Sequence, residues 1–537
     1  MRVANHLFYG DNIDVLREHV AADSIDLVYL DPPFNSNANY NILFRPPAGV
    51  LADAQIEAFE DTWHWNDHAE EAFDQVARSG NTKAFDLLNA IRTFLGDNDM
   101  MAYLAMMAVR LIELHRVLKP TGSLYLHCDS TASHYLKLVL DGVFGASNYR
   151  NEIIWRRTTS HNSANRYGKI ADTILFYTKS DDYVWNDIRT RYSDAQLSRY
   201  HDDGDRRLYR AENLTADRRN SASGKFAWRG TTPPPTRGWA YSIDQLEGWW
   251  REGRILTRRD GSPRMDGLKV YLEGMEGQKL QSVWTDIPRI GNTSAERLGY
   301  PTQKPLALLE RIIAQSSPPG GTVLDPFCGC GTAIHAAQKL GRNWIGIDIT
   351  HLAISLIEKR MQGAFPGIQF TVEGTPKDFA SAQDLALRDK YQFQWWMVSL
   401  VDAMPYGGKR KGADGGIDGI IYFKPDGRKT ERAIVSVKGG DHVGVQMIRD
   451  LHSTIMRERA PIGVFLTKSR PTAAMEKEAA AVGRFHAEAT NRSYARLQIL
   501  TLADLIDGKR PDLPFVDPTA AFRKAAVEET QLQARLF

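Results

Sequence analysis

The feature that most constrains the fold is a short apolar run, residues 25–30, that stops at Asp31-Pro32-Pro33-Phe34. A run of this length, with one Asp inside it, predicts a strand buried in a parallel sheet. Two prolines cannot continue a β-ladder, so the loop begins at the strand's carboxyl end, where open α/β sheets bind ligands. This loop offers a carboxylate, a carbonyl stiffened by proline and an aromatic ring. Such groups are suited to binding a planar ring that carries an amino group. The alternative is a strand with a plain proline turn.

A second constrained stretch lies at residues 321–332. Val323 and Leu324 end a predicted strand, a glycine-rich turn follows, and residues 332–340 have the pattern of a helix. Glycine lets the backbone approach a ligand closely, and a helix amino terminus favours carboxylate or phosphate. The next predicted strand ends in Asp348, about 20 residues after the turn, where an acid can bind ribose hydroxyls. This order predicts a nucleoside site.

The two stretches together resemble the amino-methylating DNA methyltransferases that use S-adenosyl-L-methionine. The catalytic motif comes first and the cofactor motif, Asp-Pro-Phe-Cys-Gly-Cys-Gly-Thr at residues 325–332, comes late, which resembles the β-class order. Residues 8–12, 116–127 and 300–305 resemble further segments of that family. The resemblance covers residues 1–380 apart from the variable middle. It implies an α/β fold, a Rossmann-like methyltransferase sheet with its motifs in permuted order.

The resemblance also implies roles for individual residues. The loop of Asp31, Pro32, Pro33 and Phe34 would hold a flipped-out base for catalysis, because a base inside a duplex cannot reach such a pocket. The implied cofactor-binding residues are Asp11, Lys304, Asp325, Phe327, Cys328, Gly329, Gly331, Thr332 and Asp348.

The resemblance bears on the target base as well. The family's adenine enzymes usually carry Asp at the first motif position and its cytosine-N4 enzymes usually carry Ser, so Asp31 favours N6 of adenine. An N4-cytosine methyltransferase remains the alternative. Methyl transfer of this kind needs S-adenosyl-L-methionine and no metal. An RNA or protein methyltransferase is a further alternative, since similar motifs serve other amines.

Composition limits the class of protein. At 537 residues the chain is expected to contain more than one domain. Hydrophobic residues at 43% and charged residues at 25% are typical of a soluble globular protein. The sequence has neither a membrane-length apolar run nor a signal peptide, so we expect a cytoplasmic protein. Its three cysteines give no disulfide framework, and a net charge of +2 does not itself indicate nucleic acid.

The amino-acid composition changes in the middle of the chain. Between residues 149 and 299 arginine outnumbers lysine and aromatic residues are interleaved with it. Arginine suits bidentate contacts to phosphate and guanine, so we predict a target-recognition region for double-stranded DNA; a solvated arginine-rich insertion is the alternative. The expected layout is a catalytic half (1–182, with a helical insertion at about 45–98), the recognition region (183–284), a cofactor half (285–380), a second domain (390–510) and a tail (511–537).

The second domain resembles the Mrr-type restriction endonucleases of the PD-(D/E)xK fold, a smaller α/β domain. Asp418 and Lys438 lie on two predicted strands, as in that family, where an Asp and a second acid hold a divalent metal and Lys positions water. Ser436 stands where the second acid is expected, and a hydroxyl is a poorer Mg²⁺ ligand.

Two interpretations of this domain stay open. It is either a nuclease with Mg²⁺ at Asp418 and a substitute acid (Asp414, Glu431 or Asp441), or a DNA grip that does not cut. The first would make the chain a bifunctional restriction–modification enzyme. A homodimer and a separate restriction or defence subunit are further partners that the resemblance allows.

Overall fold

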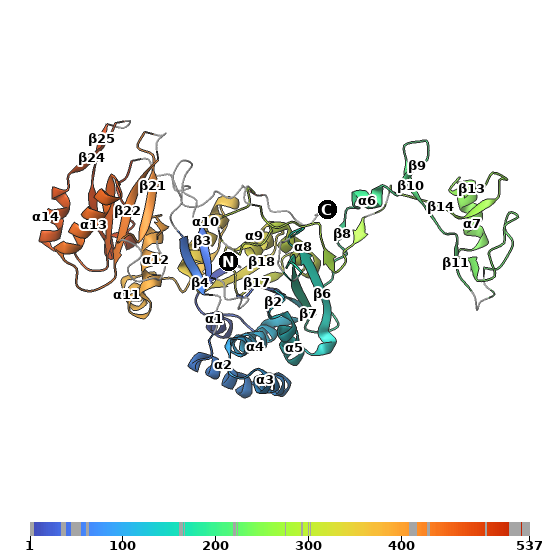
Figure 1. Cartoon of the computed structure of the whole chain (residues 1–537), viewed down its shortest axis with the longest axis horizontal. Helices are drawn as coiled ribbons and strands as arrows, with labels where there is room; N and C mark the ends of the chain where they lie inside the picture. The colour runs from blue at the N-terminus through green and yellow to red at the C-terminus, as the bar shows by residue number, and fades with distance from the viewer. Residues whose placement is uncertain are drawn as a thin grey trace. The chain divides into compact units, whose positions relative to one another are not determined.

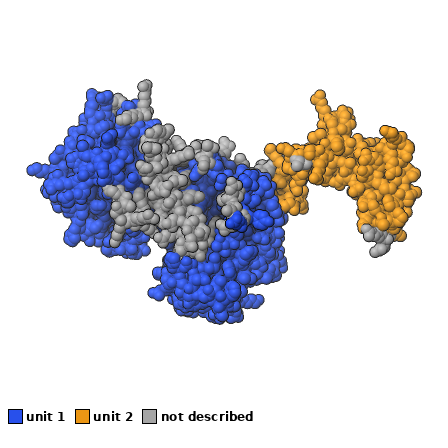
Figure 2. All heavy atoms as spheres, viewed as in Figure 1, with its two compact units in different colours: residues 1–186, 282–534 blue, residues 187–281, 535–537 orange. Residues whose placement is uncertain are grey.

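The computed structural model describes most of the chain in detail. The described residues are 5–33, 39–43 and 55–60 (backbone alone for the last two), 64–160, 165, 167–218, 222, 224–273, 275, 277–291, 294–298, 300, 302–406, 416–426, 430–488, 491–514 and 528. The chain divides into two compact units, one of residues 1–186 and 282–534 and one of residues 187–281 and 535–537 (Figure 2).

The first unit is built on a mixed sheet in which nine strands of the described chain take part. Their order is β16 (Val283–Trp284), β6 (Tyr149–Arg156), β7 (Ala171–Thr178), β5 (Leu118–Cys128), β2 (Ile25–Leu30), β17 (Thr322–Asp325), β18 (Asn343–Asp348), β1 (His6–Tyr9) and β19 (Thr371–Glu373). From β5 to β19 every neighbouring pair is parallel. All six residues of β2 are buried, as a strand covered on both faces requires. The predicted α/β fold is confirmed.

Helices lie on both faces of this sheet (Figure 1). On one face are α1 (Asn12–His19), α4 (Asp99–Val117) and α5 (Ser133–Phe144); on the other are α8 (Leu306–Ser316), α9 (Thr332–Lys339) and α10 (His351–Ala364). From the predicted insertion come α2 (Asp67–Arg78) and α3 (Thr82–Leu95), whose Phe73, Val76 and Leu88 join the core of α4 and α5. A backbone hairpin of β3 (Asn39–Leu43) and β4 (Gln55–Glu60) precedes them.

A second sheet lies in the carboxyl-terminal part of the first unit. Its order is β20 (Met404–Pro405), β21 (Gly419–Phe423), β22 (Glu431–Lys438), β23 (Ile462–Thr467) and β26 (Leu497–Thr501). The pairs β20·β21 and β21·β22 are antiparallel, and the remaining pairs are parallel. Its helices are α11 (Phe379–Arg388), α12 (Lys390–Leu400), α13 (Val445–Arg457), α14 (Ala473–Ala481) and α15 (Leu502–Ile506), beside a hairpin of β24 (Arg484–Ala487) and β25 (Arg492–Ala495).

The start of the carboxyl-terminal domain is expected at residue 390. Leu385 of α11 is buried in the same cluster as Phe393 of α12 and Val435 of β22, so α11 shares the core of that domain. The residues between the two predicted domains are therefore largely helical, and the boundary itself stays a prediction.

The second unit has its own small core. A four-stranded sheet, in the order β13 (Ile255–Thr257), β14 (Pro263–Tyr271), β10 (Leu208–Glu212) and β9 (His201–Asp202), accompanies α7 (Ile243–Arg251). Trp228, Trp239 and Leu246 are buried together. Short elements supply the rest: β8 (Arg189–Thr190) with β15 (Gln278–Lys279), β11 (Thr215–Asp217) with β12 (Arg237–Trp239), and α6 (Asp194–Leu197). None of the helices in the described part of the chain combines the length and apolar character needed to span a bilayer.

Candidate functional site

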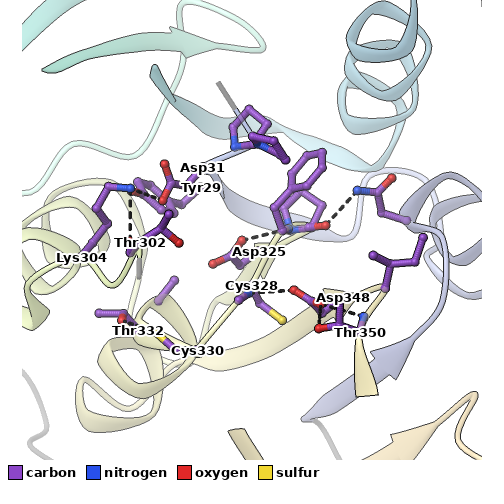
Figure 3. Close-up of a pocket in the computed structure, with 18 of the residues that line it drawn as sticks. Tyr29, Asp31, Thr302, Lys304, Asp325, Cys328, Cys330, Thr332, Asp348 and Thr350 are labelled. Carbon is purple, nitrogen blue, oxygen red and sulfur yellow. Dashed lines mark hydrogen bonds and ion pairs between the residues drawn. The ribbon is translucent and has the colours of Figure 1, made fainter. Parts of the chain in front are cut away.

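A pocket of about 270 Å³ opens where β1, β2, β17 and β18 end (Figure 3). Parallel neighbours finish at one edge of a sheet, so the segments that follow these four strands meet there. The residues predicted from the sequence that line the pocket are Asp11, Asp31, Pro32, Pro33, Lys304, Asp325, Phe327, Cys328, Gly329, Thr332 and Asp348. Gly331 lies in the turn but does not line the pocket, and Phe34 falls outside the described residues.

Asp31 directly follows β2, and its two carboxylate oxygens have different surroundings. Oδ2 accepts a hydrogen bond from Nζ of Lys304, which also lines the pocket (Figure 3). Oδ1 is buried and has no hydrogen-bond partner in the part of the chain that the structure describes. A buried acceptor without a donor costs free energy in the folded protein, so Oδ1 is available to a donor brought by a ligand.

The glycine-rich turn joins β17 to α9 and is tied to the end of β18. Gly331 caps α9 with φ at 74°, and a Cβ at this position would lie 2.8 Å from Cγ1 of Ile357. The turn therefore needs glycine for both conformation and space. Gly329 donates its backbone N–H to Oδ2 of Asp348 at 3.0 Å, which holds the acid against the turn.

Asp348 is fixed by its other oxygen as well. Oδ1 accepts from the backbone N–H of Thr350 at 2.9 Å and from its hydroxyl at 2.8 Å. Burial raises the pKa of Asp348 to about 6, although these hydrogen bonds act to lower it. Burial also raises the pKa of Asp325 well above its usual range, and Asp31 is among the charges that raise it further. Burial thus weakens the ionisation of two acids of the pocket, Asp348 and Asp325.

Sequence reasoning missed Arg110, a buried residue of α4 that lines the pocket. Its guanidinium donates to Oδ1 of Asp11 at 2.9 Å and to Oδ1 of Asn12 at 2.6 Å, and Asn12 in turn donates to the carbonyl of Pro326 at 2.9 Å. These contacts link α4, α1 and the glycine-rich turn. The signal in the sequence was an arginine inside an otherwise apolar helical stripe. Tyr29 and Thr350 were missed as well.

Residues 25–359, more than half of the chain, match the family model described as DNA methylase. The chain belongs to this family. Type II methyltransferase M.EcaI of Enterobacter cloacae is 33% identical over 262 residues, which cover 48% of this chain and 57% of that protein. The Mod subunit of the type III restriction-modification enzyme StyLTI, from Salmonella typhimurium, is 26% identical over 352 residues, covering 63% of this chain and 50% of the subunit.

A third relative matches over most of its own length. DNA adenine methyltransferase YhdJ of Escherichia coli is 25% identical over 363 residues, which cover 67% of this chain and 84% of that protein. The chain spans about half the length of M.EcaI and of the StyLTI Mod subunit.

The pocket residues fit the cofactor of this family. Asp348 offers a carboxylate beside the glycine-rich turn, where ribose hydroxyls can donate to it. Asp325 is a further acid in the pocket wall that suits a cationic sulfonium. Lys304 and Arg110, which pair with Asp31 and Asp11, add positive charge to the same wall, and this charge suits a carboxylate. A ligand that carries a nucleoside, a sulfonium and an amino acid matches this set of groups.

The carboxyl-terminal domain is restriction endonuclease-like. Residues 396–507 match the model of NACHT-associated inactive restriction endonuclease 1. The structure brings Asp418 and Ser436 together, since Ser436 Oγ lies 3.2 Å from Oδ2 of Asp418. The backbone N–H of Val437 donates to the same oxygen at 2.6 Å, and the Gln394 amide donates to Oδ1 at 2.7 Å. Both oxygens of this buried carboxylate therefore accept hydrogen bonds from the protein.

The two substitute acids that the structure describes, Glu431 and Asp441, do not complete a metal site there. Glu431 lies at the opposite end of β22 from Lys438, and Asp441 is ion-paired with Lys468 at 2.7 Å. Asp414 falls outside the described residues. Within the described part of the chain, no group of three or more His, Cys, Asp or Glu side chains is arranged to hold a metal ion.

The raised pKa of Asp348 predicts how cofactor affinity depends on pH. Ribose hydroxyls that donate to Asp348 need its ionised form, so affinity for S-adenosyl-L-methionine should fall up to about tenfold per pH unit below about 6. Calorimetric titration of the full chain between pH 5 and 7 measures this. Asp348→Asn should flatten the dependence, and an affinity of the wild type that does not change with pH would contradict it.

The same raised pKa affects stability with a defined sign. Folded Asp348 holds its proton more tightly than unfolded Asp, whose pKa is 3.8, so its contribution to stability is present below pH 4 and is lost as pH rises to about 6. Without cofactor, Asp348→Asn should therefore raise the thermal midpoint at pH 7 and leave it nearly unchanged at pH 4.

Proposed function

We propose that the chain is a site-specific DNA methyltransferase that transfers a methyl group from S-adenosyl-L-methionine to N6 of adenine. The observation that carries the proposal is the buried Oδ1 of Asp31, which has no hydrogen-bond partner among the described residues and lies in the same pocket as Asp348 and the glycine-rich turn. An acceptor for an amine thus lies beside a site that suits a nucleoside cofactor.

The proposed mechanism depends on the Asp31 loop. An exocyclic amine is a weak nucleophile because its lone pair is delocalised into the ring. Asp31 Oδ1 and the carbonyl of Pro32 accept its two hydrogens and concentrate the lone pair on nitrogen, while Lys304 holds the other oxygen of Asp31 in place. The cofactor supplies an electrophilic methyl group, and catalysis consists chiefly of positioning. No covalent enzyme intermediate is required.

The choice of adenine rests on Asp31, which stands at the first position of the motif. A relative named a DNA adenine methyltransferase, YhdJ, supports it. The cofactor roles of Asp11, Lys304 and the residues of the glycine-rich turn are part of the same proposal, as is the role of Phe34 in stacking on the base.

We propose further that the second unit contacts DNA through exposed arginines. Several of its arginines are engaged within the unit: Arg229 pairs with Glu247 at 2.7 Å and lies 4.5 Å from the Trp250 ring centre. Arg258 and Arg259, by contrast, are exposed in the turn between β13 and β14. Guanidinium groups presented on a hairpin turn suit phosphate contact.

For the carboxyl-terminal domain we propose DNA binding without cleavage. At Asp418 the Gln394 amide and the Val437 N–H would compete with Mg²⁺ for the carboxylate oxygens, and Ser436 adds no negative charge. The word "inactive" in the name of the matching family supports this reading. A tethered DNA-binding domain raises the local concentration of substrate. The Mrr-like assignment, a homodimer and a separate restriction subunit stay predictions; the last has support from a relative named a Mod subunit.

Removing the amine acceptor tests the main proposal. Asp31→Ala should lower the single-turnover rate of DNA methylation at least about 10²-fold, because the acceptor that activates the amine is lost, while cofactor affinity stays within about threefold. The assay is transfer of labelled methyl to DNA, with single-molecule sequencing to identify the modified base. Asp14→Ala, on the surface of α1, is the control. Wild-type activity in Asp31→Ala would refute the role, and N4-methylcytosine in the product would refute the adenine assignment.

Arginine substitutions test the contact with DNA. Arg258→Ala and Arg259→Ala should each weaken DNA binding and reduce the slope of log affinity against log salt by about one, as expected for one lost phosphate contact. Fluorescence anisotropy at several salt concentrations measures both quantities. Arg229→Ala is the matched control, because its guanidinium is committed to Glu247 and Trp250. Slopes that equal the wild-type slope in the first two variants would count against the proposed contact.

Asp418 should prove structural. Asp418→Ala leaves the Val437 N–H and the Gln394 amide without their acceptor, so the free energy of unfolding should fall by about 2 kcal/mol. Asp450→Ala, an exposed acid of α13, should change it by less than about 0.5 kcal/mol. Chemical denaturation measures both. Cleavage of plasmid by the wild type with Mg²⁺ or Mn²⁺, abolished in Asp418→Ala and Lys438→Ala, would instead establish a nuclease.

A further inference from the structure

Helix α12 of the carboxyl-terminal domain packs against α10, the helix that follows the end of β18. Gln392 of α12 is buried, and its Oε1 accepts the backbone N–H of His351 at 3.2 Å. His351 is the first residue of α10. The first N–H groups of a helix have no partner within that helix, so a buried helix start needs an acceptor from another segment. Gln392 supplies this acceptor from 41 residues further along the chain.

The start of α10 is joined directly to the pocket. Asp348, Ile349 and Thr350 line the pocket, and Thr350 caps α10. Thr350 donates its backbone N–H and its hydroxyl to Oδ1 of Asp348, while Gly329 donates its N–H to Oδ2. A shift of the first turn of α10 would therefore move two of the donors that orient the Asp348 carboxylate.

The carboxyl-terminal domain holds α10 at two further places. Trp395, three residues after Gln392 and so on the same face of α12, is buried in a cluster with Leu352 of α10. The Asp402 carboxylate, just beyond α12, pairs with Lys359 in the second half of α10 at 2.7 Å. Contacts from this domain thus hold α10 at its start, near its first turn and in its second half.

The cluster around Trp395 also reaches the pocket wall. Tyr300 and Cys330 line the pocket and are buried in this same cluster. Tyr300 lies close over the glycine-rich turn, since a Cβ on Gly329 would come within 3.2 Å of its ring. The packing to which α12 contributes therefore supports two parts of the wall, the turn under Tyr300 and the segment that ends β18.

Other residues of α12 belong to the core of its own domain. Gln394 donates to Asp418, and Trp396 is buried with Val435 of β22. These contacts dock α12 in the carboxyl-terminal domain. They do not explain a buried amide at Gln392, because a buried polar group destabilises a fold unless it has a partner, and its partner is the start of α10.

We propose that α12 is a positioning element of the cofactor site, in which Gln392 and Trp395 hold the start of α10 and the wall at Tyr300. The proposal rests on the cofactor site proposed above and extends it, because it makes affinity for S-adenosyl-L-methionine depend on the endonuclease-like domain. By linkage, cofactor binding then strengthens the contact between α10 and α12 by the same factor. This domain thus contributes to methyl transfer independently of any contact that it makes with DNA.

Gln392→Met in the full chain tests the proposal, because Met has a similar length and offers no amide oxygen. Affinity for S-adenosyl-L-methionine should fall about threefold to tenfold, the change expected when one positioning hydrogen bond is lost. The single-turnover rate of DNA methylation at saturating cofactor should stay within about twofold of the wild-type rate, since the groups that face the base are unchanged. Calorimetry measures the affinity, and transfer of labelled methyl to DNA measures the rate.

Gln394→Met is the matched control, with the same change on the same helix. It removes the amide that donates to Asp418 and leaves the contact with α10 intact. Both variants lose one hydrogen bond of α12, so both should lower the thermal midpoint measured without cofactor. Only Gln392→Met should lose cofactor affinity, which separates positioning of the pocket from a general loss of stability.

Trp395→Phe provides a second variant, in case Gln392→Met does not fold. It keeps an aromatic ring and thins the packing beside α10, so cofactor affinity should fall at least about twofold. Trp396→Phe is its control, because this neighbouring tryptophan is buried in the core of the carboxyl-terminal domain. The cofactor affinity of Trp396→Phe should equal that of the wild type.

Two results would overturn the proposal. One is a wild-type cofactor affinity in folded Gln392→Met, or in Trp395→Phe if the first variant does not fold. The other is an equal loss of affinity in the two controls, which would trace the loss to stability. A wild type that does not bind S-adenosyl-L-methionine would instead refute the proposed cofactor site, so the two failures are distinguishable.

Discussion

The parallel pairing of β2 with β17 is the contact on which the site depends. Leu27 and Val28 lie in register with Val323 and Leu324, so the two strands end at the same edge. Asp31 and the glycine-rich turn, far apart in the sequence, become two walls of one pocket. The distance between the two walls is set by the main-chain hydrogen bonds between β2 and β17 and not by side chains alone. The helices α8 and α4 pack against opposite faces of this part of the sheet.

The chemistry of the pocket follows from burying several acids close together. Each carboxylate is stabilised differently: Asp348 by backbone and hydroxyl donors, Asp31 by one ammonium group, and Asp325 by a single amide at 3.1 Å. Burial raises the pKa of Asp325 strongly, and this one amide only partly opposes it. A cationic ligand relieves the mutual repulsion of such a cluster. Affinity and acidity are therefore coupled in this site, and the same burial that weakens the acids strengthens their attraction to a sulfonium.

Local sequence patterns predicted much of this structure. The apolar run before two prolines predicts β2 and the position of Asp31 at its end. The glycine-rich turn and the strand after it predict that Asp348 lies beside that turn. Both predictions depend only on short stretches of sequence. Arg110 and Tyr29 were not predicted, since their partners lie on elements whose adjacency depends on the order of strands in the sheet. The state of Asp418 was open for a similar reason: Gln394, which occupies one of its oxygens, comes from a separate helix.

The separation of β2 and β17 along the chain has a consequence for synthesis in the cell. A ribosome must add residues 31–321 after β2 emerges and before β17 begins, which takes between roughly 15 and 60 seconds at typical elongation rates. Until β5 is made, both edges of β2, an apolar strand, are open, and the edge that pairs with β17 stays open until the end of the interval. Open apolar edges pair with other chains, so the nascent amino-terminal half is a client for chaperones until the cofactor half is made.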